Sequence, residues 1–416
     1  MRRPVQLMIN SNVRSSFPTL PCLYRRLRSC RSVAANNWAN CCWVRGIVRS
    51  SLGFIESSAI DWGGRECCRL TEVKIQENVA LAPFTTFGIG GPARWFVEAA
   101  SEAEIVDAVN WARERSVPLF VLGGGSNLLV SDAGFSGLVL RVALKGVSSE
   151  NDGGNRVFRV AAGEDWDGLV RRAIAEDCSG IECLAGIPGT VGGTPVQNVG
   201  AYGQEVSETI EQVRVLDLES LNFQEMAAEA CGFAYRSSIF NSSARGRYLV
   251  VRADFRLTPG GSAKLRYADL QRVFPNGSDP SLVEVAATVR GIRHSKGMLL
   301  LDGDADCRSA GSFFKNPIIA ADRYVELAAR LGTEPPHYPA ASDQVKLPAA
   351  WLIEKAGFAK GFCLGHAGIS SRHTLALVNR GGATAAEMLA LRDVIVAGVE
   401  ARFGVALQME PVLVGF

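Results

Sequence analysis

The 416-residue chain contains no run of 18 or more apolar residues, so the sequence does not predict a membrane-spanning helix. Histidine is scarce, with only His294, His337, His366 and His373. The five cysteines beyond residue 70 form no C-x-x-C pair, which argues against a zinc site and against a disulfide framework. We therefore expect no metal site, and scattered buried thiols in a reducing compartment.

Acidic residues are few in residues 1–70, which hold eleven arginines and three acids. The remainder has 33 basic and 39 acidic residues, so the net charge of +2 conceals an acidic body. That body lacks the basic balance of a nucleic-acid-binding protein. The length predicts two or three domains with ample cores. We expect a monomeric cytoplasmic enzyme without nucleic-acid or membrane partners.

Residues 1–72 lack clear periodicity, and we expect no ordered fold there. Three interpretations compete: an organelle transit peptide, a disordered arm, or translated sequence upstream of the true start. The arginine-rich, acid-poor composition fits a transit peptide. The dispersed tryptophans and adjacent cysteine pairs favour a misassigned start. N-terminal sequencing of the native protein tests this, and a mature start near residue 2 would contradict it.

Helix and strand signals alternate along the rest of the chain. Ser101 and Glu104 form a capping box, and apolar residues then recur at helical spacing, so we expect a helix over 102–115. RWFVEAA, 118–122 and LLVS are predicted strands, with a glycine loop between the last two. Further strands are expected at 213–218, 229–235 and 248–257, and helices at 282–292, 320–331, 351–356 and 384–402.

A boundary is expected at Pro259, Gly260 and Gly261, because proline and glycine cluster there. It divides the body into residues 73–260 and 261–416. The alternation of strand, helix, strand and glycine loop predicts an α/β unit whose ligand loop lies at the carboxyl end of a strand.

Residues 184–203 read LAGIPGTVGGTPVQNVGAYG and contain six glycines. Glycine permits positive φ angles and close approach of the backbone, at a cost in conformational entropy. Backbone N–H groups, with Thr190, Thr194, Gln197 and Asn198, suit a diphosphate held without a metal. The alternative is a loop crowded against a sheet. The preceding GGGSNLL lacks the G-K-[ST] of a Walker A loop and the third glycine of G-x-G-x-x-G, so another nucleotide-binding fold is implied.

Six motifs occur in order: FTTFGIGG, VLGGGSNLLV, GIPGTVGGTPVQNVGAYG, FAYRSSIF, AGSFFKNP and FGVALQMEPVLVG. Over residues 73–416 the chain resembles the UDP-N-acetylenolpyruvoylglucosamine reductase family of peptidoglycan precursor synthesis. The resemblance implies an α/β (α+β) fold. A two-part FAD-binding domain of the vanillyl-alcohol oxidase (PCMH) type would be followed by a smaller C-terminal α/β substrate domain. It also implies that NADPH reduces FAD, which then reduces a UDP-sugar enolpyruvyl ether to UDP-N-acetylmuramate.

The FAD is expected to be noncovalent, because all four histidines lie beyond the flavin half and none is placed to attach it. Recovery of a covalent flavin peptide would contradict this. The two glycine loops are the expected cofactor site. Its residues are Gly123, Gly124, Gly125, Ser126, Asn127, Leu128, Gly186, Pro188, Gly189, Thr190, Gly192, Gly193, Gln197, Asn198, Gly200 and Ala201.

Three residues match the family's catalytic positions. Ser312 in AGSFFKNP would protonate the carbon next to the hydride acceptor, since a weak acid suffices for a strongly basic enolate. Arg236 in AYRSS would hold the substrate carboxylate. Glu410 in QMEPV would act with Arg236 near the enolate. Pro411 follows where the family usually has valine, so we expect this strand at an edge or end.

The resemblance also suggests substrate contacts at Tyr235, Tyr267, Lys296 and Asn316. Tyr267 matches the tyrosine of a subclass with an inserted loop over the substrate diphosphate, and Lys296 matches a lysine that engages phosphates. We expect that subclass. Cys363 stands where a glutamine is often seen, so no role is assigned there.

Two alternatives remain. A flavin oxidase of the same superfamily, acting on a small alcohol, would keep the glycine loops without needing all three catalytic residues. A non-catalytic flavin or sugar-nucleotide binding protein would bind flavin that NADPH does not reduce.

Overall fold

The structure is a computed structural model that describes residues 73–341 and 343–416. The expectation of no ordered fold in residues 1–72 lies outside the described residues. The described chain starts with a four-stranded sheet in the order β1 (Gln76–Ala80), β2 (Pro92–Ala99), β5 (Phe135–Val142) and β3 (Leu119–Leu122). The last three strands are parallel, and β1 is antiparallel to β2.

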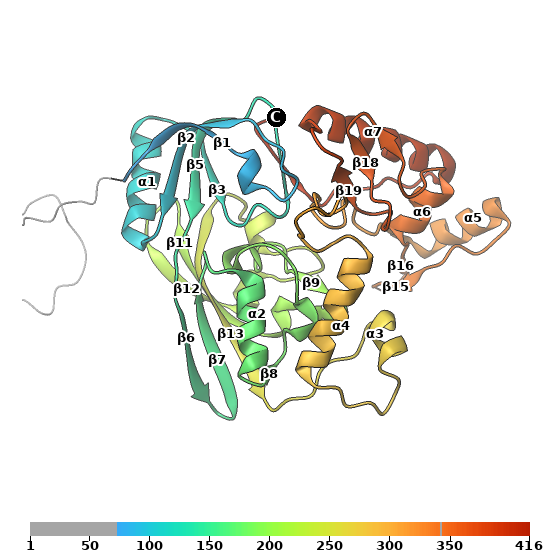
Figure 1. Ribbon diagram of the computed structural model, residues 1–416, viewed down its shortest axis with the longest axis horizontal. Coiled ribbons are helices and arrows are strands. Elements are labelled where there is room, and N and C mark those ends of the chain that lie inside the picture. The colour runs from blue at the N-terminus through green and yellow to red at the C-terminus, as the bar shows by residue number, and fades with distance from the viewer. Residues whose placement is uncertain (1–72, 342) are drawn as a thin grey trace, which may run out of the picture. The chain divides into compact units, whose positions relative to one another are not determined.

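Helix α1 (Glu102–Glu114) confirms the helix expected over 102–115 and lies beside this sheet (Figure 1). The Ser101 hydroxyl accepts a hydrogen bond from Glu104 N at 3.2 Å. The Glu104 carboxylate reaches one residue further back than a capping box requires, to Ala100 N at 2.6 Å. Ile105, Ala108, Val109 and Ala112 are buried, as the 3.6-residue period demands.

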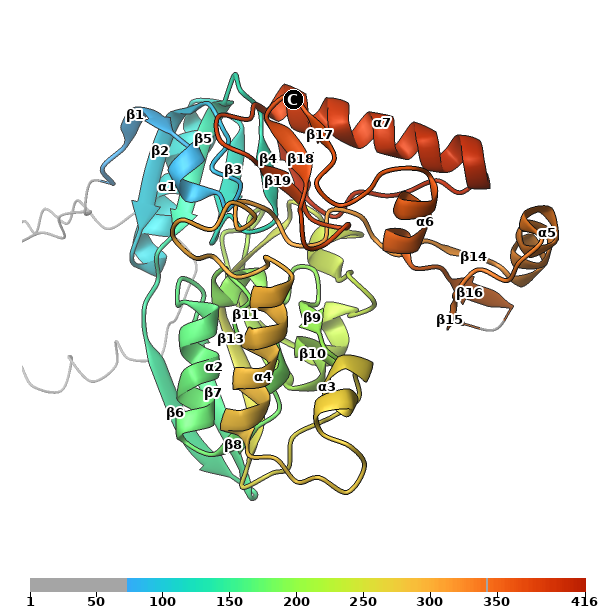
Figure 2. The ribbon, with the colours of Figure 1, turned by 45° about the vertical axis from the view of Figure 1, so that its right-hand side comes forward.

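A second, antiparallel sheet has the order β12 (Phe223–Ala227), β11 (Ile210–Asp217), β13 (Tyr248–Pro259), β7 (Asn155–Ala161) and β6 (Val147–Asp152). The short β8 (Cys178–Ser179) pairs with the end of β13. Helices α2 (Trp166–Ala175) and α4 (Leu282–Ser295) lie side by side against it (Figures 1 and 2). The two sheets are the two parts of the first domain.

The strand predicted over 229–235 is wrong. Ala228–Cys231 is a 3-10 turn that ends at Gly232 with φ +57°. A tight turn follows, in which Ala234 N and O bond to Ser237 O and N. The left-handed glycine and the turn break the extended backbone that the Phe and Tyr content had suggested. The strands predicted at 213–218 and 248–257 are confirmed as β11 and β13.

The C-terminal part is built around α7 (Ala385–Phe403), with α6 (Ala349–Lys355) beside it and the sheet β17 (Cys363–Leu364), β18 (Ala367–Ile369), β19 (Leu377–Asn379) (Figure 2). A separate small sheet, β14 (Ile318–Ala320), β16 (Gln344–Lys346) and β15 (Tyr338–Pro339), carries α5 (Ala321–Leu331). The Thr384–Glu387 capping box is confirmed, and α5 and α7 both end at left-handed glycines.

Two large hydrophobic clusters divide the described chain. The second collects apolar residues of α5, α6, α7 and the β17–β19 sheet. The first cluster packs both sheets together with α1 and α2. It also includes Leu270, Val285 and Val289, which lie beyond the boundary expected at residue 261. That boundary stays a prediction. None of the helices in the described residues is long and apolar enough to cross a membrane.

The C-terminal strand β20 (Val412–Val414) returns to the first domain and pairs in parallel with β4 (Leu128–Val130). These two strands form a sheet of their own. Pro411 directly precedes β20, so its missing N–H removes no bond from the ladder, and the expectation of a strand end is confirmed. The pairing brings the end of the chain to the first glycine loop.

Candidate active site

The two glycine loops lie against each other. A Cβ built on Gly124 would stand 2.5 Å from Gly189 Cα, and one on Gly123 would stand 3.0 Å from the Thr190 hydroxyl. Trp166 N donates to Gly189 O and Val191 N donates to Glu164 O, which ties the second loop to the start of α2. Only glycine allows these backbones to approach so closely.

The first loop leaves backbone donors free for a ligand. The N–H groups of Gly124, Gly125, Ser126 and Asn127 have no hydrogen-bond acceptor among the described residues. Such a run of successive free backbone N–H groups forms a concavity that favours an anion. Gly193 is exposed, and a Cβ there would meet nothing within 4 Å. These groups fit the diphosphate of a dinucleotide cofactor.

Asn127 connects both loops with the end of the chain. Its Nδ2 donates to Gln197 Oε1 at 2.6 Å and to Glu410 O at 3.2 Å. Its carbonyl accepts from Val412 N at 2.9 Å. One amide side chain therefore fixes the cofactor loops relative to the predicted catalytic glutamate.

A cavity of about 590 Å³ opens beside the loops. All seven residues predicted for catalysis or substrate binding line it: Tyr235, Arg236, Tyr267, Lys296, Ser312, Asn316 and Glu410. Six of the predicted cofactor residues also line it: Ser126, Asn127, Pro188, Gln197, Gly200 and Ala201.

The other ten predicted cofactor residues do not line the cavity. They are Gly123, Gly124, Gly125, Leu128, Gly186, Gly189, Thr190, Gly192, Gly193 and Asn198. Two of them have evident packing roles. A Cβ on Gly192 would stand 2.6 Å from Ala162 Cβ. The Asn198 side chain is 1% exposed and bonds to Glu205, Ala234 and Ser207 within the protein. Cofactor contacts at these ten positions remain predictions.

Arg236 sits at the tip of the tight turn and has φ +54°, which is unfavourable for a side-chain-bearing residue. Its guanidinium Nη2 donates to Gly200 O at 2.6 Å, and its Nε lies 3.3 Å from Glu410 Oε1. The turn is held because Asn198 Nδ2 donates to Ala234 O. The strained backbone aims the guanidinium into the cavity.

Glu410 is largely buried, with 14% of its side chain exposed. Burial raises the pKa of the Glu410 carboxyl, and the charges of Arg236 and Lys315 oppose that rise. Glu410 N donates to Phe313 O at 2.8 Å, which places the glutamate next to the segment of Ser312. The carboxyl therefore keeps its proton to a higher pH than an ordinary glutamate.

Ser312 follows Gly311, which has φ +71°. The next residue, Phe313, donates its N–H to Leu375 O at 2.7 Å beside β19. Phe313 and Phe314 are fully buried. A hydroxyl flanked by a left-handed glycine and a buried aromatic pair is held at the cavity wall.

Lys296 lies at the end of α4, between two tyrosine rings. Its ammonium is 5.8 Å from the Tyr202 ring centre and 5.9 Å from the Tyr267 ring centre. Asp269 Oδ2 accepts from it at 2.8 Å. The two rings meet edge to face at 5.3 Å. A cation beside two hydroxyl-bearing rings is suited to phosphate oxygens.

Tyr235 and Asn316 line the same cavity, and the Arg236 guanidinium carbon is 5.1 Å from the Tyr235 ring centre. The Lys346 ammonium is 5.0 Å from the Tyr235 ring centre. Asn316 Oδ1 accepts from Ala349 N at the start of α6 at 2.9 Å, so part of this side chain serves a helix end.

The cavity-lining residues that sequence reasoning missed include Tyr202, Arg293, Lys346 and His373. Arg293 is 5% exposed and donates to Gly186 O at 3.1 Å and Met298 O at 2.8 Å. Burial, with the charges of Lys296 and Lys360, lowers the pKa of His373 to about 4, so its ring is neutral at pH 7. Arg293 falls on the buried face of α4, one turn before Lys296. The helical period of the apolar residues could therefore have indicated that Arg293 is buried near Lys296.

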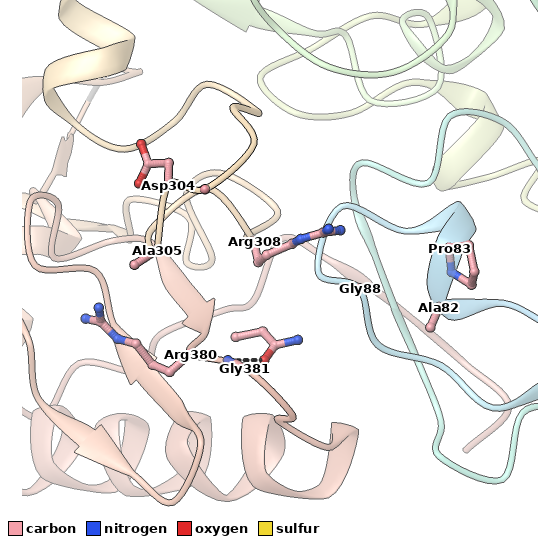
Figure 3. Close-up of a pocket in the computed structure, with 10 residues that line it drawn as sticks. Ala82, Pro83, Gly88, Asp304, Ala305, Arg308, Arg380 and Gly381 are labelled. Carbon is pink, nitrogen blue, oxygen red and sulfur yellow. Dashed lines mark hydrogen bonds between the residues drawn. The ribbon is translucent and has the colours of Figure 1, made fainter.

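A second, open cavity of about 660 Å³ lies between the 3-10 turn Ala82–Phe84 and the end of β19. Arg308 extends across it toward Gly88, whereas the Arg380 guanidinium points away (Figure 3). It contains none of the predicted site residues. Its wall includes Asp304 and Arg308, which belong to the same loop as Ser312.

Two protein-family models match the chain. Residues 303–414 match the C-terminal domain of UDP-N-acetylenolpyruvoylglucosamine reductase, and residues 93–220 match an FAD binding domain. The expected FAD-binding domain is thereby confirmed. The described fold, in which an FAD-binding domain precedes a smaller C-terminal part of mixed helix and sheet, agrees with the expectation.

Relatives of known name extend over most of the chain. The UDP-N-acetylenolpyruvoylglucosamine reductase of Thermobifida fusca is 48% identical over 348 residues, which cover 81% of this chain and 97% of the relative. That of Streptomyces coelicolor is 45% identical over 356 residues, covering 83% and 92%. The crystal structure of UDP-N-acetylenolpyruvylglucosamine reductase from Thermus caldophilus matches with a TM-score of 0.56 and 26% identity, covering 82% and 99%.

Six ordered motifs, two family models and relatives of this identity agree with one another. The chain is a flavoprotein oxidoreductase and belongs to the UDP-N-acetylenolpyruvoylglucosamine reductase family.

Proposed function

We propose that this protein uses NADPH to reduce UDP-N-acetylglucosamine enolpyruvate to UDP-N-acetylmuramate in the cytoplasm, for peptidoglycan precursor synthesis. One observation carries the proposal. Arg236, Ser312 and Glu410 come from three distant segments and line one cavity beside the glycine loops. A binding protein or an alcohol oxidase does not need this set.

The free amides of residues 124–127 would hold the diphosphate of FAD, with Asn127 and Gln197 fixing the loop. When bound, FAD supplies hydride transfer, from NADPH to the enolpyruvyl C3. The flavin is proposed to be noncovalent and released by acid or heat.

Arg236 would bind the substrate carboxylate and oppose the negative charge that develops there after hydride addition. Glu410 lies 3.3 Å from the guanidinium and is prone to carry a proton, so it can donate a hydrogen bond to the same carboxylate. Ser312 would pass its hydroxyl proton to the carbon adjacent to C3.

Lys296, Tyr202 and Tyr267 would grip the UDP diphosphate at the far end of the cavity. Tyr267 supports membership of the tyrosine-loop subclass, because it lies in the segment between β13 and α4 and lines the cavity. Tyr235 and Asn316 would complete the wall nearer Arg236. The protein is proposed to act as a monomer.

Flavin absorbance, followed with NADPH and the enolpyruvyl sugar nucleotide added separately, tests the function. We expect bleaching by NADPH and recovery of the oxidised spectrum on adding the sugar nucleotide without oxygen. Recovery that needs oxygen and ignores the sugar nucleotide would instead indicate an oxidase. Flavin that NADPH never bleaches would indicate a binding protein.

A further inference from the structure

The loop before Ser312 contains a buried carboxylate that the proposed reaction does not use. Asp306 is 2% exposed and lies six residues before Ser312. Its Oδ2 accepts from the Ser371 hydroxyl at 2.6 Å and from Arg372 Nε at 3.1 Å. Its Oδ1 accepts from Ser371 N at 3.2 Å and lies 3.1 Å from Arg380 Nη1.

Burial alone would raise the pKa of Asp306, but the bonds from Ser371, Arg372 and Arg380 outweigh it and hold the pKa below its ordinary value. The carboxylate is therefore ionised and its oxygens are saturated with donors. A buried charge that is paired in this way resists displacement, because removing one partner leaves the others uncompensated.

The same group of side chains, Asp304, Asp306, Ser371, Arg372 and Arg380, is here named the Asp306 cluster. It joins three segments that reach the cavity. Arg372 also pairs with Asp304 and donates from Nη1 to His294 O at 3.0 Å, near the end of α4. Gly297 follows Lys296 directly after α4. A Cβ built on Gly297 would stand 2.8 Å from Asp306 Cβ, so the segment after α4 packs directly on the cluster.

Beyond the cluster, the loop toward Ser312 is held at few points. Ser309 forms a bridge with Val378, and Gly311 N donates to the Ser309 hydroxyl at a long 3.3 Å. One side of this loop faces the active cavity through Cys307, Ser309 and Ser312, and the other faces the open second cavity through Asp304 and Arg308. Cys307 and Ser309 are buried, but the charged side chains of the cluster are the polar contacts that tie the base of this loop to the other two segments.

We propose that Asp306 is a positioning residue for Ser312: its buried ion-pair cluster locks the 303–312 loop between the end of α4 and the β18–β19 turn. This inference rests on the proposed function, in which Ser312 donates the proton. The cluster sets the direction of that hydroxyl without touching the substrate. Arg372 carries the same constraint to the segment of Lys296, so the phosphate-binding end and the protonating end keep a fixed separation.

The test is a double-mutant cycle with the full-length, flavin-loaded protein. Asp306→Asn keeps the shape of the side chain but removes its charge. We expect it to slow reoxidation of the reduced flavin by the enolpyruvyl sugar nucleotide about tenfold, while reduction by NADPH changes less than about twofold. In a Ser312→Ala background the same change should have almost no further effect, because residues that act together are not additive.

Arg308→Met is the matched control. Arg308 lies two residues from Asp306 on the side of the second cavity, and its side chain has no hydrogen bond or ion pair within the described residues. We expect wild-type kinetics. An Asp306→Asn effect that persists undiminished in the Ser312→Ala background would overturn the proposal.

Hydrogen exchange gives a readout that does not depend on turnover. In Asp306→Asn the amides of residues 307–311 should exchange faster, with the amides of α7 unchanged. If the exchange rates of the amides of residues 307–311 did not change, the positioning role of Asp306 would be refuted even if the kinetics changed. Failure of the wild-type protein to oxidise NADPH with the sugar nucleotide would instead count against the proposed function and leave the exchange result to decide the role of Asp306.

Discussion

The two walls of the active cavity are built by opposite means. The glycine loops at 123–128 and 184–203 offer backbone and gain their shape from missing side chains. The other wall offers charged and hydroxyl side chains, Arg236, Ser312 and Glu410, drawn from segments far apart in the chain. The first wall suits a ligand that stays bound, and the second suits a substrate whose charge changes during reaction. Substitutions in the backbone wall should therefore weaken flavin binding, whereas substitutions in the side-chain wall should slow the reaction with substrate.

Ser312→Ala breaks the side-chain wall and has the largest expected effect. Loss of the proton donor should slow flavin reoxidation by the sugar nucleotide by about 10²–10⁴-fold. Flavin reduction by NADPH should stay nearly unchanged, because the role proposed for Ser312 begins only after hydride has reached the sugar nucleotide. Rapid-mixing absorbance of the flavin measures both steps. Equal losses in the two half-reactions would contradict the role proposed for Ser312.

Two neighbouring glycines sharpen the comparison on the backbone wall. Gly193→Val adds a side chain into open space, so the fold should survive while flavin affinity falls about tenfold or more if the cofactor lies there. Gly192→Val drives a side chain into Ala162 and should cost about 1–3 kcal/mol of unfolding free energy by overpacking.

Flavin titration and urea unfolding of both variants distinguish ligand contact from packing. Full flavin retention in Gly193→Val would show that this part of the loop only packs against the protein.

His373 offers a smaller, pH-dependent test. Its pKa falls from an ordinary 6.5 to about 4 in the folded protein, chiefly through burial. A depressed folded pKa gives stability that is present above pH 6.5 and is lost as the pH falls toward 4. Between pH 7 and 5 the wild type should lose about 1–2 kcal/mol relative to His373→Gln. Urea unfolding of both proteins at the two pH values measures the difference, and parallel curves would contradict it.

Glu410 gives a second pH-dependent test, with the opposite sign. Its raised folded pKa gives stability below about pH 4.5 that is lost as the pH rises through the folded value. Between pH 4 and 8 the wild type should therefore lose stability relative to Glu410→Gln, because the buried carboxyl must give up its proton as the pH rises. Thermal unfolding across this range is the measurement. A difference that grows in the other direction would show that the carboxyl is ionised at low pH.

The backbone wall can be proposed from the sequence without a relative, because its information is contiguous. The glycines at 123–125 and the glycine-rich segment 186–203 indicate ligand-binding loops from local sequence alone. The same holds for α7, whose start and end are marked by Thr384 and Gly404. The side-chain wall needed family resemblance, because nothing local distinguishes Arg236 from a surface arginine.

What the sequence did not reveal depended on tertiary context. The segment 229–235 has strand-like residues, but Gly232 and the turn at Ala234–Ser237 override them. Arg293 and His373 are ordinary residue types whose meaning comes from burial beside the cavity. The hydrogen bonds of Asn127 to Gln197 and Glu410 could not be predicted either, because they form only where the two loops and the C-terminal segment meet. These features arise from long-range packing, which propensity does not encode.

The pairing of β20 with β4 has a consequence for biosynthesis. Strand β4 leaves the ribosome long before residues 412–414 are synthesised. The first glycine loop, which precedes β4, is therefore completed only when β20 pairs with β4. Asn127 and Glu410 are joined across most of the chain, and such non-local contacts form late. A nascent chain can thus complete much of its first core and still have no catalytic centre. We therefore expect a chain that stops before Glu410 to be inactive, because it lacks both this carboxyl and the strand partner of β4.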